Sequence, residues 1–570
     1  MGDRTERPVN SPEPEESWRA RILAEDGAIL GAGILLGTET VLTCAHVVPE
    51  GQGVLVDLEG APDGRTVPAR VVEGCWIPET TDSHGEPSGD VALLTLRTAQ
   101  PAGRGATFHR VSPSWHRTVH MYGYPEWLDW GVWFRARLAG RCGLDGRVQM
   151  FPATPEEAVR PGFSGAAVTD DLSGQVIGMV VSRYRDEDGL RLSYMIPTET
   201  VLRHLPRVRA WVSGGSAVDL SLVSGSVEEV LDAPFAERLV HWLDGTDPAE
   251  VKISTVLPGD QHRARTLQRA ITLADRELAG RGADPPSAAA PPATVPPVGS
   301  LDLAIDAAGR SAAYVAERVA ERLGLGLAGS DGEAGTTDPL ARLRDAEIPL
   351  TAVVDGVDEA AEPAALVDLL GLLAERGCRL LLVFHTPDSP SRRRAEHEIA
   401  ARPRITRLAA LLDEITVRRQ QRLRELHLLV TADLRQATTA LTRAHALRSH
   451  LAALRAPGAG SGPPPLPTPA ELAAFERTAE LARDQVERAV ARLEALVARR
   501  DVLRGRLIPF QAMLAAHRAL EDTAVAPHYR RAHDSLWQAP CDLAVAEEAV
   551  ARYIEAVVRR TGGTPGEAAP

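Results

Sequence analysis

Short apolar runs alternate with turn residues along the first two hundred positions of the chain. Segments such as RARILAE, GAGILLG, TVLTCAHVV, GVLVDLE, VALLTL and QVIGMVVSRY are separated by Gly, Pro and Asp. Short strands at such spacing indicate an all-β sandwich or barrel. A barrel closes its own strand edges and leaves its loops free to carry chemistry. The pattern predicts an all-β domain over residues 15–210.

The pattern changes to alternating strands and helices between residues 251 and 395. LTAVV and CRLLLVF are apolar strand runs, and SLDLAIDAAGRSAAYVAERVAERLGL has the pattern of a strand followed by an amphipathic helix. This alternation predicts a central α/β domain over 251–395. Residues 211–250 are predicted to connect it to the β domain, and the Pro/Ala-rich segment 280–300 to be a flexible insertion.

From residue 396 onward apolar residues recur at steps of three and four, which is typical of amphipathic helices. They are Leu408, Leu411, Ile415, Leu423, Leu426, Val430, Leu434, Ala437 and Leu441, then Leu472, Phe475, Ala479, Val486, Ala489, Leu493 and Leu496. We expect a long helix over 396–455, a Pro/Gly linker over 456–469, and a partner helix with further helices over 470–560. The two long helices would form an antiparallel coiled-coil hairpin, which makes this an all-α region.

Composition agrees with a multidomain soluble protein. At about 150 residues per domain, a chain of 570 residues suggests three or four units. The net charge of -14 argues against a nucleic-acid partner for the whole chain, because phosphate contact needs a basic surface. The two ends, 1–14 and 561–570, are predicted to be disordered.

Targeting and redox signals point to the cytoplasm. The N-terminal stretch MGDRTERPVNSPEPEESW has no apolar core, and no run of about 18 apolar residues follows, so no membrane contact is expected. The five cysteines are scattered and include no C-x-x-C pair. The sequence therefore predicts neither a disulfide framework nor a metal site, but buried free thiols.

Three segments of the β domain together suggest nucleophilic catalysis. His46 follows the strand-like run TVLT, Asp90 stands before VALLTL, and Ser164 lies between glycines in RPGFSGAAV. Each residue alone is common in purely structural positions, but the order His, Asp, Ser is that of one known triad arrangement. His46 would be the general base, Asp90 would orient it, and Ser164 would be the nucleophile. The backbone amides of Gly162 and Ser164 would form the oxyanion hole.

These segments, with LSYMIPTETV, resemble the trypsin-like (chymotrypsin-fold) serine peptidases, in particular their bacterial cytoplasmic and HtrA-like branch. The resemblance covers about residues 15–205. It implies a double β-barrel and an endopeptidase that cleaves a protein substrate through an acyl-enzyme intermediate, without a cofactor. It also implies a substrate cleft beside Val181, Ser182 and Arg183.

The chain departs from the secreted trypsins at Phe163, where they carry the Asp that captures a newly cleaved N-terminus. Activation by N-terminal cleavage is therefore not expected. No acidic residue can be assigned to the base of the specificity pocket, so a preference for Lys or Arg at the cleaved bond does not follow.

In the central domain, LTAVVDGVDEA resembles the Walker B motif of NACHT-like STAND NTPases. The resemblance implies that Asp355 would serve Mg²⁺, while Asp358 and Glu359 would position water. The alternative is a buried strand that ends in an acidic turn, and it stays open.

An upstream phosphate loop is expected ahead of a Walker B motif. Gly259, Ala264, Arg265 and Thr266 fall at its four positions, with Ala for the second Gly and Arg for the Lys. A Cβ at residue 264 crowds phosphate, and a guanidinium is larger than the usual ammonium. These residues read as a vestigial P-loop-like site that does not use ATP or Mg²⁺. That GDQHRART is only the start of a helix remains the alternative.

The sequence thus favours a cytoplasmic trypsin-like endopeptidase joined to a degenerate STAND-like module and a helical region. The helices would serve self-association or a protein partner. Bacterial conflict proteins of similar architecture imply a peptidase effector that the other modules gate. Three alternatives remain: a non-proteolytic binding scaffold, a nucleotide-sensing signalling protein, and control through oligomerisation of the helices.

Overall fold

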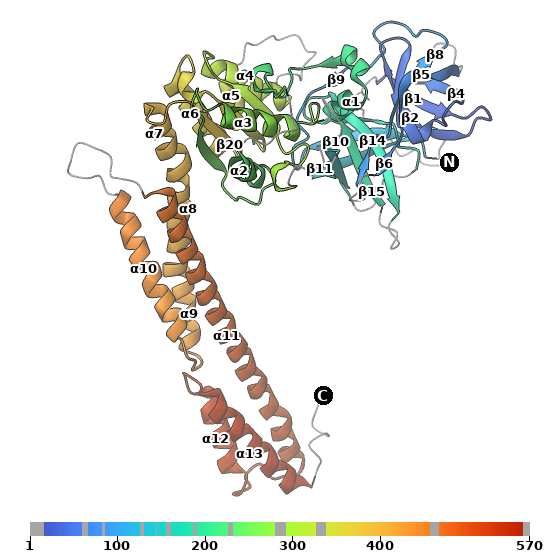
Figure 1. The fold of residues 1–570 in the computed structure, drawn as a ribbon. Coiled ribbons are helices and arrows are strands. Elements are labelled where there is room, and N and C mark those ends of the chain that lie inside the picture. Colours follow the sequence, from blue (N-terminus) through green and yellow to red (C-terminus); the bar gives the residue numbers. More distant parts are fainter. Residues whose placement is uncertain are drawn as a thin grey trace. The chain divides into compact units, whose positions relative to one another are not determined.

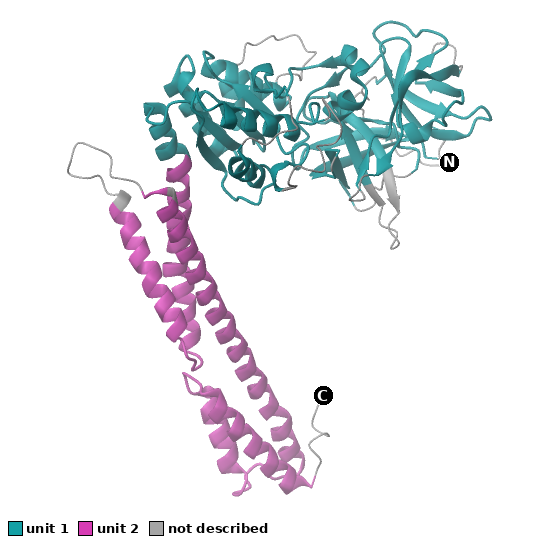
Figure 2. Ribbon diagram, in the orientation of Figure 1, with its two compact units in different colours: residues 1–399 teal, residues 400–570 magenta. Residues whose placement is uncertain are grey.

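The computed structural model describes residues 16–59, 66–81, 86–125, 130–143, 145–154, 161–185, 191–225, 232–279, 292–325, 338–455 and 467–562. The chain divides into two compact units, residues 1–399 and 400–570 (Figure 2). The predicted disordered end 1–14, nearly all of the predicted tail 561–570, and most of the predicted insertion 280–300 and linker 456–469 lie outside the described residues.

Six strands close the first β-barrel in the order β1-β2-β3-β8-β5-β4. They are β1 (Arg19–Leu23), β2 (Ile29–Leu36), β3 (Thr40–Thr43), β4 (Val54–Leu58), β5 (Val67–Ile77) and β8 (Val91–Leu96). Alternating side chains point inward, as in VLVDL of β4, where Val54, Val56 and Leu58 are buried. The period of two that predicts the strands therefore also fills the barrel core.

A second barrel follows in the sequence. Its sheet has the order β13-β10-β11-β12-β15-β14-β9-β16, and the pairing of β13 with β14 closes six of these strands. The strands are β9 (Phe108–His109), β10 (Thr118–Gly123), β11 (Val132–Cys142), β12 (Arg147–Pro152), β13 (Ala167–Asp170), β14 (Val176–Arg185), β15 (Arg191–Pro197) and β16 (Val212–Ser213). A short ribbon joins β6 (Thr80–Thr81) to β7 (Pro87–Ser88). The predicted double barrel is confirmed (Figure 1).

Beyond the barrels the chain runs directly into the α/β part of the same unit. Helix α1 (Thr198–His204) follows β15, and β16 pairs with β9. Val218 then forms a bridge to Ala304, and α2 (Ala233–Leu243) packs into the α/β core. The described part of the predicted connector 211–250 is therefore built into the folded unit.

Four parallel strands form the central sheet in the order β17-β20-β19-β18, and helices cover both of its faces (Figure 1). The elements are β17 (Val251–Thr255), α3 (Gln261–Ala274), β18 (Leu303–Asp306), α4 (Ala312–Arg322), α5 (Pro339–Asp345), β19 (Thr351–Asp355), α6 (Pro363–Glu375), β20 (Arg379–Phe384) and α7 (Pro390–Ala395). Along β19, Val353 packs with α2 and α3, whereas Ala352 and Val354 pack with α4 and α6. Strands buried on both faces read as continuous apolar runs, as the sequence does here.

The second unit is helical. Its elements are α8 (Arg402–Asp413), a π-helical turn (Glu414–Arg419), α9 (Gln420–His427), α10 (Arg435–Arg455), α11 (Pro469–Ala516), α12 (Ala526–Trp537) and α13 (Leu543–Thr561). Thr468 and Glu471 form a reciprocal capping box at the start of α11. No helix within the described ranges is long and apolar enough to cross a membrane.

The prediction of one long helix over 396–455 is wrong. Helix α9 ends at His427, and the next helix begins at Arg435. Between them Val430 bridges to Cys541, with Cys541 N donating to Leu429 O and Thr431 N donating to Cys541 O, each at 3.0 Å. The three- and four-residue spacing of apolar residues continues through this break, so periodicity alone could not reveal it.

Candidate active site

His46 lies on a single 3₁₀ turn, Ala45–Val47, directly after β3. The Trp76 indole holds this turn by donating from Nε1 to Ala45 O at 3.1 Å and to Val48 O at 3.2 Å. The His46 side chain is 27% exposed. An imidazole on a rigid turn that still reaches solvent is accessible to a substrate.

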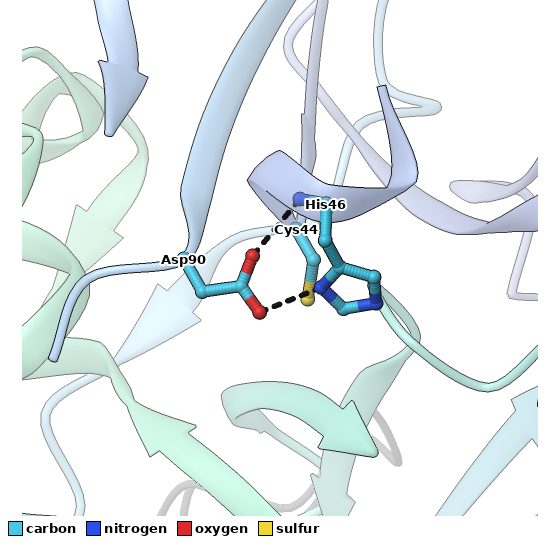
Figure 3. Close-up of side chains that lie close together, drawn as sticks. All are labelled: Cys44, His46 and Asp90. Atoms are coloured by element: carbon cyan, nitrogen blue, oxygen red, sulfur yellow. Dashed lines mark hydrogen bonds and ion pairs between the residues drawn. The ribbon is translucent and has the colours of Figure 1, made fainter. Parts of the chain in front are cut away.

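Asp90 pairs with this imidazole from the start of β8. Its Oδ2 lies 2.7 Å from His46 Nδ1, and its Oδ1 accepts from the His46 backbone amide at 3.0 Å (Figure 3). The Asp90 side chain is 0% exposed. Because an ionised carboxylate only accepts hydrogen bonds, Nδ1 carries the proton and Nε2 is left as the acceptor.

Ser164 comes from the second barrel and meets the first at β2. Its carbonyl accepts from the Ala32 amide at 2.8 Å, and the Ala32 carbonyl accepts from Thr43 Oγ1 at 2.7 Å. Ser164 is 4% exposed. The loop that carries Ser164 is therefore hydrogen-bonded to β2, which neighbours β3, the strand that leads into His46.

Two more contacts bring the Ser164 loop and the His46 segment together. The Val180 carbonyl accepts from the Gly165 amide at 2.9 Å and from Cys44 Sγ at 3.3 Å. A Cβ on Gly31 would lie 2.9 Å from both the Ser164 carbonyl and a Val47 methyl group. The structure thus places His46, Asp90 and Ser164 where the two barrels meet.

Gly162 and Phe163 fix the path of the loop before Ser164. Gly162 has φ +104°, and a Cβ there would lie 2.1 Å from the Tyr124 carbonyl, so only glycine fits. Phe163 is buried in the core of the second barrel, edge-on to Phe134 with ring centroids 6.0 Å apart. Apolar packing of residue 163 therefore anchors the loop at the position where secreted trypsins carry an aspartate.

The predicted substrate cleft is only partly described. Val181 is completely buried among the core residues of the first barrel, so its side chain has no surface open to a substrate, contrary to the prediction. The side chains of Ser182 and Arg183 lie outside the described residues.

Cys44 lies beside the imidazole and is the residue of the site that sequence reasoning left unassigned. Its Sγ and donor atoms of His46 and Asp90 lie within 4.8 Å of one another, which is close enough to hold a metal ion. Burial raises the pKa of the Cys44 thiol well above its ordinary value, and the Asp90 charge raises it further. With Sγ donating to Val180 and the other two donors paired, all three atoms already have partners.

At the candidate phosphate loop, a side chain of the protein itself occupies the start of the helix. Asp260 caps α3, its carboxylate accepting from Arg263 N at 3.1 Å, so a negative charge stands where a phosphate would bind. Gly259 and Arg265 are exposed. Thr266 is buried, its hydroxyl donating to His262 O at 2.7 Å and accepting from Asp232 N at 3.2 Å.

The acidic residues after β19 are paired with the end of β20. Asp358 accepts from the amides of His385 and Thr386 at 2.9 and 2.7 Å. The His385 imidazole lies 3.3 Å from Asp355 Oδ1 and 3.0 Å from Glu359 Oε2. Burial lowers the pKa of His385, but these two carboxylates outweigh it and raise the pKa. Burial raises the pKa of Asp355. His385 had no signal in the sequence beyond its place after a strand.

Comparisons with known proteins place the two barrels among trypsin-like domains. Residues 31–179 match the family model described as the trypsin-like peptidase domain. A protein of Arabidopsis thaliana named "Putative protease Do-like 14" is 25% identical over 249 residues, which are 41% of this chain and 53% of the relative. The chain therefore spans about half the length of that curated relative.

Among solved structures, the mouse brain serine protease neuropsin is 15% identical, with a TM-score of 0.28 over 34% of this chain and 94% of neuropsin. The family match and the double barrel show that the N-terminal part of the chain carries a trypsin-like peptidase domain, which supports a peptide hydrolase.

Proposed function

We propose that the two barrels form a serine endopeptidase that cleaves a protein substrate. The observation that carries the proposal is the buried Asp90 carboxylate, 2.7 Å from His46 Nδ1, at the junction where the Ala32 amide holds the Ser164 carbonyl. A serine hydroxyl needs a base to become a nucleophile at neutral pH, and a neutral imidazole with Nε2 free to accept supplies it.

In the proposed reaction His46 Nε2 takes the Ser164 Oγ proton as Oγ attacks the scissile carbonyl. Asp90 stabilises the imidazolium that forms. The amides of Gly162 and Ser164 would bind the oxyanion, each contributing about 3 kcal/mol to transition-state stability. His46 then gives its proton to the leaving amine, and water, deprotonated by His46, hydrolyses the acyl-enzyme ester.

Nucleotide use is not the function that the central sheet supports. The Asp260 carboxylate at the start of α3 repels phosphate, and Asp355 and Glu359 already pair with the His385 imidazole. We propose that this domain uses neither ATP nor Mg²⁺ and that proteolysis needs no cofactor. The likeness to NACHT-like STAND modules stays a proposal about the origin of the fold.

The helical unit and the cellular setting complete the proposal. Helices α8 to α13 would serve self-association or a protein partner and gate the peptidase, with no nucleic-acid or membrane partner. The five cysteines are free, which agrees with a reducing cytoplasm. A role as an effector in bacterial conflict is proposed on the resemblance of architecture.

Covalent labelling of the full chain with a fluorophosphonate probe tests the proposal. We expect one adduct, located by mass spectrometry at Ser164, and none in Ser164→Ala or His46→Ala. Ser173→Ala is the matched control, because Ser173 is a buried serine of the same barrel bonded to Asp170, and it should label like the wild type. A wild type that folds but takes no label would favour the non-proteolytic scaffold.

A further inference from the structure

A buried carboxylate from the second barrel accepts hydrogen bonds from the two residues just before Asp90. Asp145 lies on the turn between β11 and β12 and is 3% exposed. Its Oδ2 accepts from the Gly89 amide at 3.1 Å, and its Oδ1 accepts from Ser88 Oγ at 3.1 Å. One side chain therefore binds both residues that precede the candidate catalytic aspartate.

Arg147, two residues further on, binds the other side of Gly89. Its Nη2 donates to the Gly89 carbonyl at 3.2 Å, and its Nη1 lies 3.2 Å from Glu79 Oε2. The Asp90 amide donates to Ile77 O at 3.1 Å. The peptide group between Gly89 and Asp90 is thus hydrogen-bonded at both its C=O and its N–H.

The backbone at this point needs such support. Gly89 has φ +84° and Asp90 has φ +68°, so two consecutive residues are left-handed. For a residue with a side chain this conformation costs about 1–2 kcal/mol. A Cβ on Gly89 would lie 2.5 Å from the Pro78 carbonyl, so residue 89 has to be glycine. Relaxation of Asp90 to a right-handed conformation would turn its carboxylate away from His46.

We propose that Asp145 and Arg147 are positioning residues that hold the Gly89–Asp90 backbone so that the Asp90 carboxylate faces His46. The inference rests on the proposed peptidase function and adds to it residues of the second barrel that orient a catalytic group of the first. Both side chains are buried, so each acts through Asp90 and not by a contact with substrate.

Arg203 and His204 hold the Asp145 carboxylate in place and favour its ionised form. Arg203 pairs with its carboxylate, and His204 Nε2 lies 3.0 Å from Oδ1. Burial raises the pKa of Asp145, but the hydrogen bond from His204 and the charge of Arg203 outweigh it, and the pKa is lowered. The Asp145 backbone carbonyl also accepts from Thr200 Oγ1 at 3.2 Å, so α1 binds this turn at several points.

The α/β domain contacts the turn that carries Asp145. Arg276, at the end of α3, donates from Nε to the Gly146 carbonyl at 3.3 Å. Glu199 of α1 forms a buried ion pair with Arg322 of α4. The residues that orient Asp90 are therefore themselves held by the α/β domain, which makes that domain part of the working peptidase.

The rate of fluorophosphonate labelling at Ser164 in the full chain, measured from pH 5 to pH 9, tests the inference without a known substrate. Asp145→Ala should label at least about 10-fold more slowly than the wild type. The acidic limb of its pH profile should also move to lower pH, because a misplaced carboxylate no longer stabilises the imidazolium. Asp171→Ala is the matched control, since Asp171 pairs with His120 at 2.5 Å in the same barrel, and it should label within twofold of wild type with an unmoved limb.

Ser88→Ala removes a single hydrogen bond to Asp145 and leaves the buried ion pairs intact, so it carries the test if Asp145→Ala does not fold. We expect labelling two- to fivefold slower, with the same direction of pH shift. Slower labelling with an unmoved acidic limb would overturn the inference, because it would mean only fewer folded molecules. If the variants label at the wild-type rate with an unmoved acidic limb, the inference is wrong but the peptidase proposal stands. If the wild type itself takes no label, both proposals are wrong.

Discussion

At Gly162 and Gly165 the backbone around Ser164 takes positive φ angles, and a side chain at either position would meet neighbouring backbone. A Cβ on Gly165 would lie 2.1 Å from the Ala32 carbonyl, as close as the Cβ of residue 162 would lie to the Tyr124 carbonyl. Both obstacles are backbone atoms: the Ala32 carbonyl already accepts from Thr43 Oγ1, and Tyr124 is held to the loop by its amide, which donates to the Gly162 carbonyl at 3.0 Å. The two glycines are thus required by the packing of the barrels around Ser164, in addition to any role as amide donors.

Gly162→Ala should abolish labelling of Ser164, by at least about a hundredfold, because the loop must move and the oxyanion hole moves with it. Gly174→Ala is the control: Gly174 has φ +67° in the same barrel, but a Cβ there would meet nothing within 4 Å. It should cost only the strain of about 1 kcal/mol and label normally. Labelling rates and thermal unfolding midpoints of both variants check this, and equal effects would show that strain alone matters.

The sequence reveals those candidate site residues that stand in a local motif. His46, Asp90 and Ser164 stand in short recognisable segments, and the structure brings these segments together. Asp145 has no such motif, because its partner Gly89 lies 56 residues away and the contact exists only once the two barrels have closed. The prediction for Val181 is wrong for a related reason: Val180 and Val181 of β14 are both completely buried, in two different core clusters, and local alternation does not show that both faces of a strand are covered.

A buried aspartate follows the last residue of α3. This residue, Asp275, accepts from the amides of Glu277 and Leu278 at 2.9 Å each. Burial, and after it the charge of nearby Glu199, raise the pKa of Asp275 to about 6. The folded protein thus holds this proton more tightly than the unfolded chain, whose pKa is near 3.8.

Stability is therefore lost as the pH rises from about 4 to about 6 and Asp275 ionises, a loss of about 3 kcal/mol for two pKa units. Asp275→Asn copies the protonated form and keeps the acceptor oxygen. It should unfold at a higher temperature than the wild type at pH 7 and at the same temperature at pH 4. The exposed Asp388→Asn should show no such pH-dependent gain. If Asp275→Asn is instead less stable than the wild type at pH 7, the ionised Asp275 carboxylate stabilises the fold and the prediction is wrong.

Element types were more predictable than element ends and breaks. The apolar runs LTAVV and CRLLLVF become the parallel strands β19 and β20, since a run buried on both faces has few other solutions. The break at Val430 was missed because its cause is a pairing with Cys541, more than a hundred residues away. Local periodicity contains no trace of that contact.

For the whole molecule, the predicted boundary at residue 210 falls inside unit 1. Across this boundary Arg110 Nε lies 3.2 Å from Glu277 Oε2, Ser112 Oγ donates to Asp302 at 2.7 Å, and the Arg322–Glu199 pair is buried. Composition changes at residue 210 because the architecture changes from β to α/β. Charged side chains look alike in a sequence whether they face water or a neighbouring domain, so the interface was not predicted.

Two truncated chains test whether the two barrels need the α/β domain for labelling. A chain of residues 1–399 keeps every contact around Asp145 and α1, so we expect it to label at least as fast as the full chain, and faster where the helices hold the site shut. A chain of residues 1–210 loses β16, Arg276 and Arg322, which leaves β9, the Gly146 carbonyl and Glu199 without those partners. It should unfold at a lower temperature and label at least about 10-fold more slowly. If the shorter chain instead labels as fast as residues 1–399, the barrels are catalytically self-sufficient and the α/β domain serves another purpose.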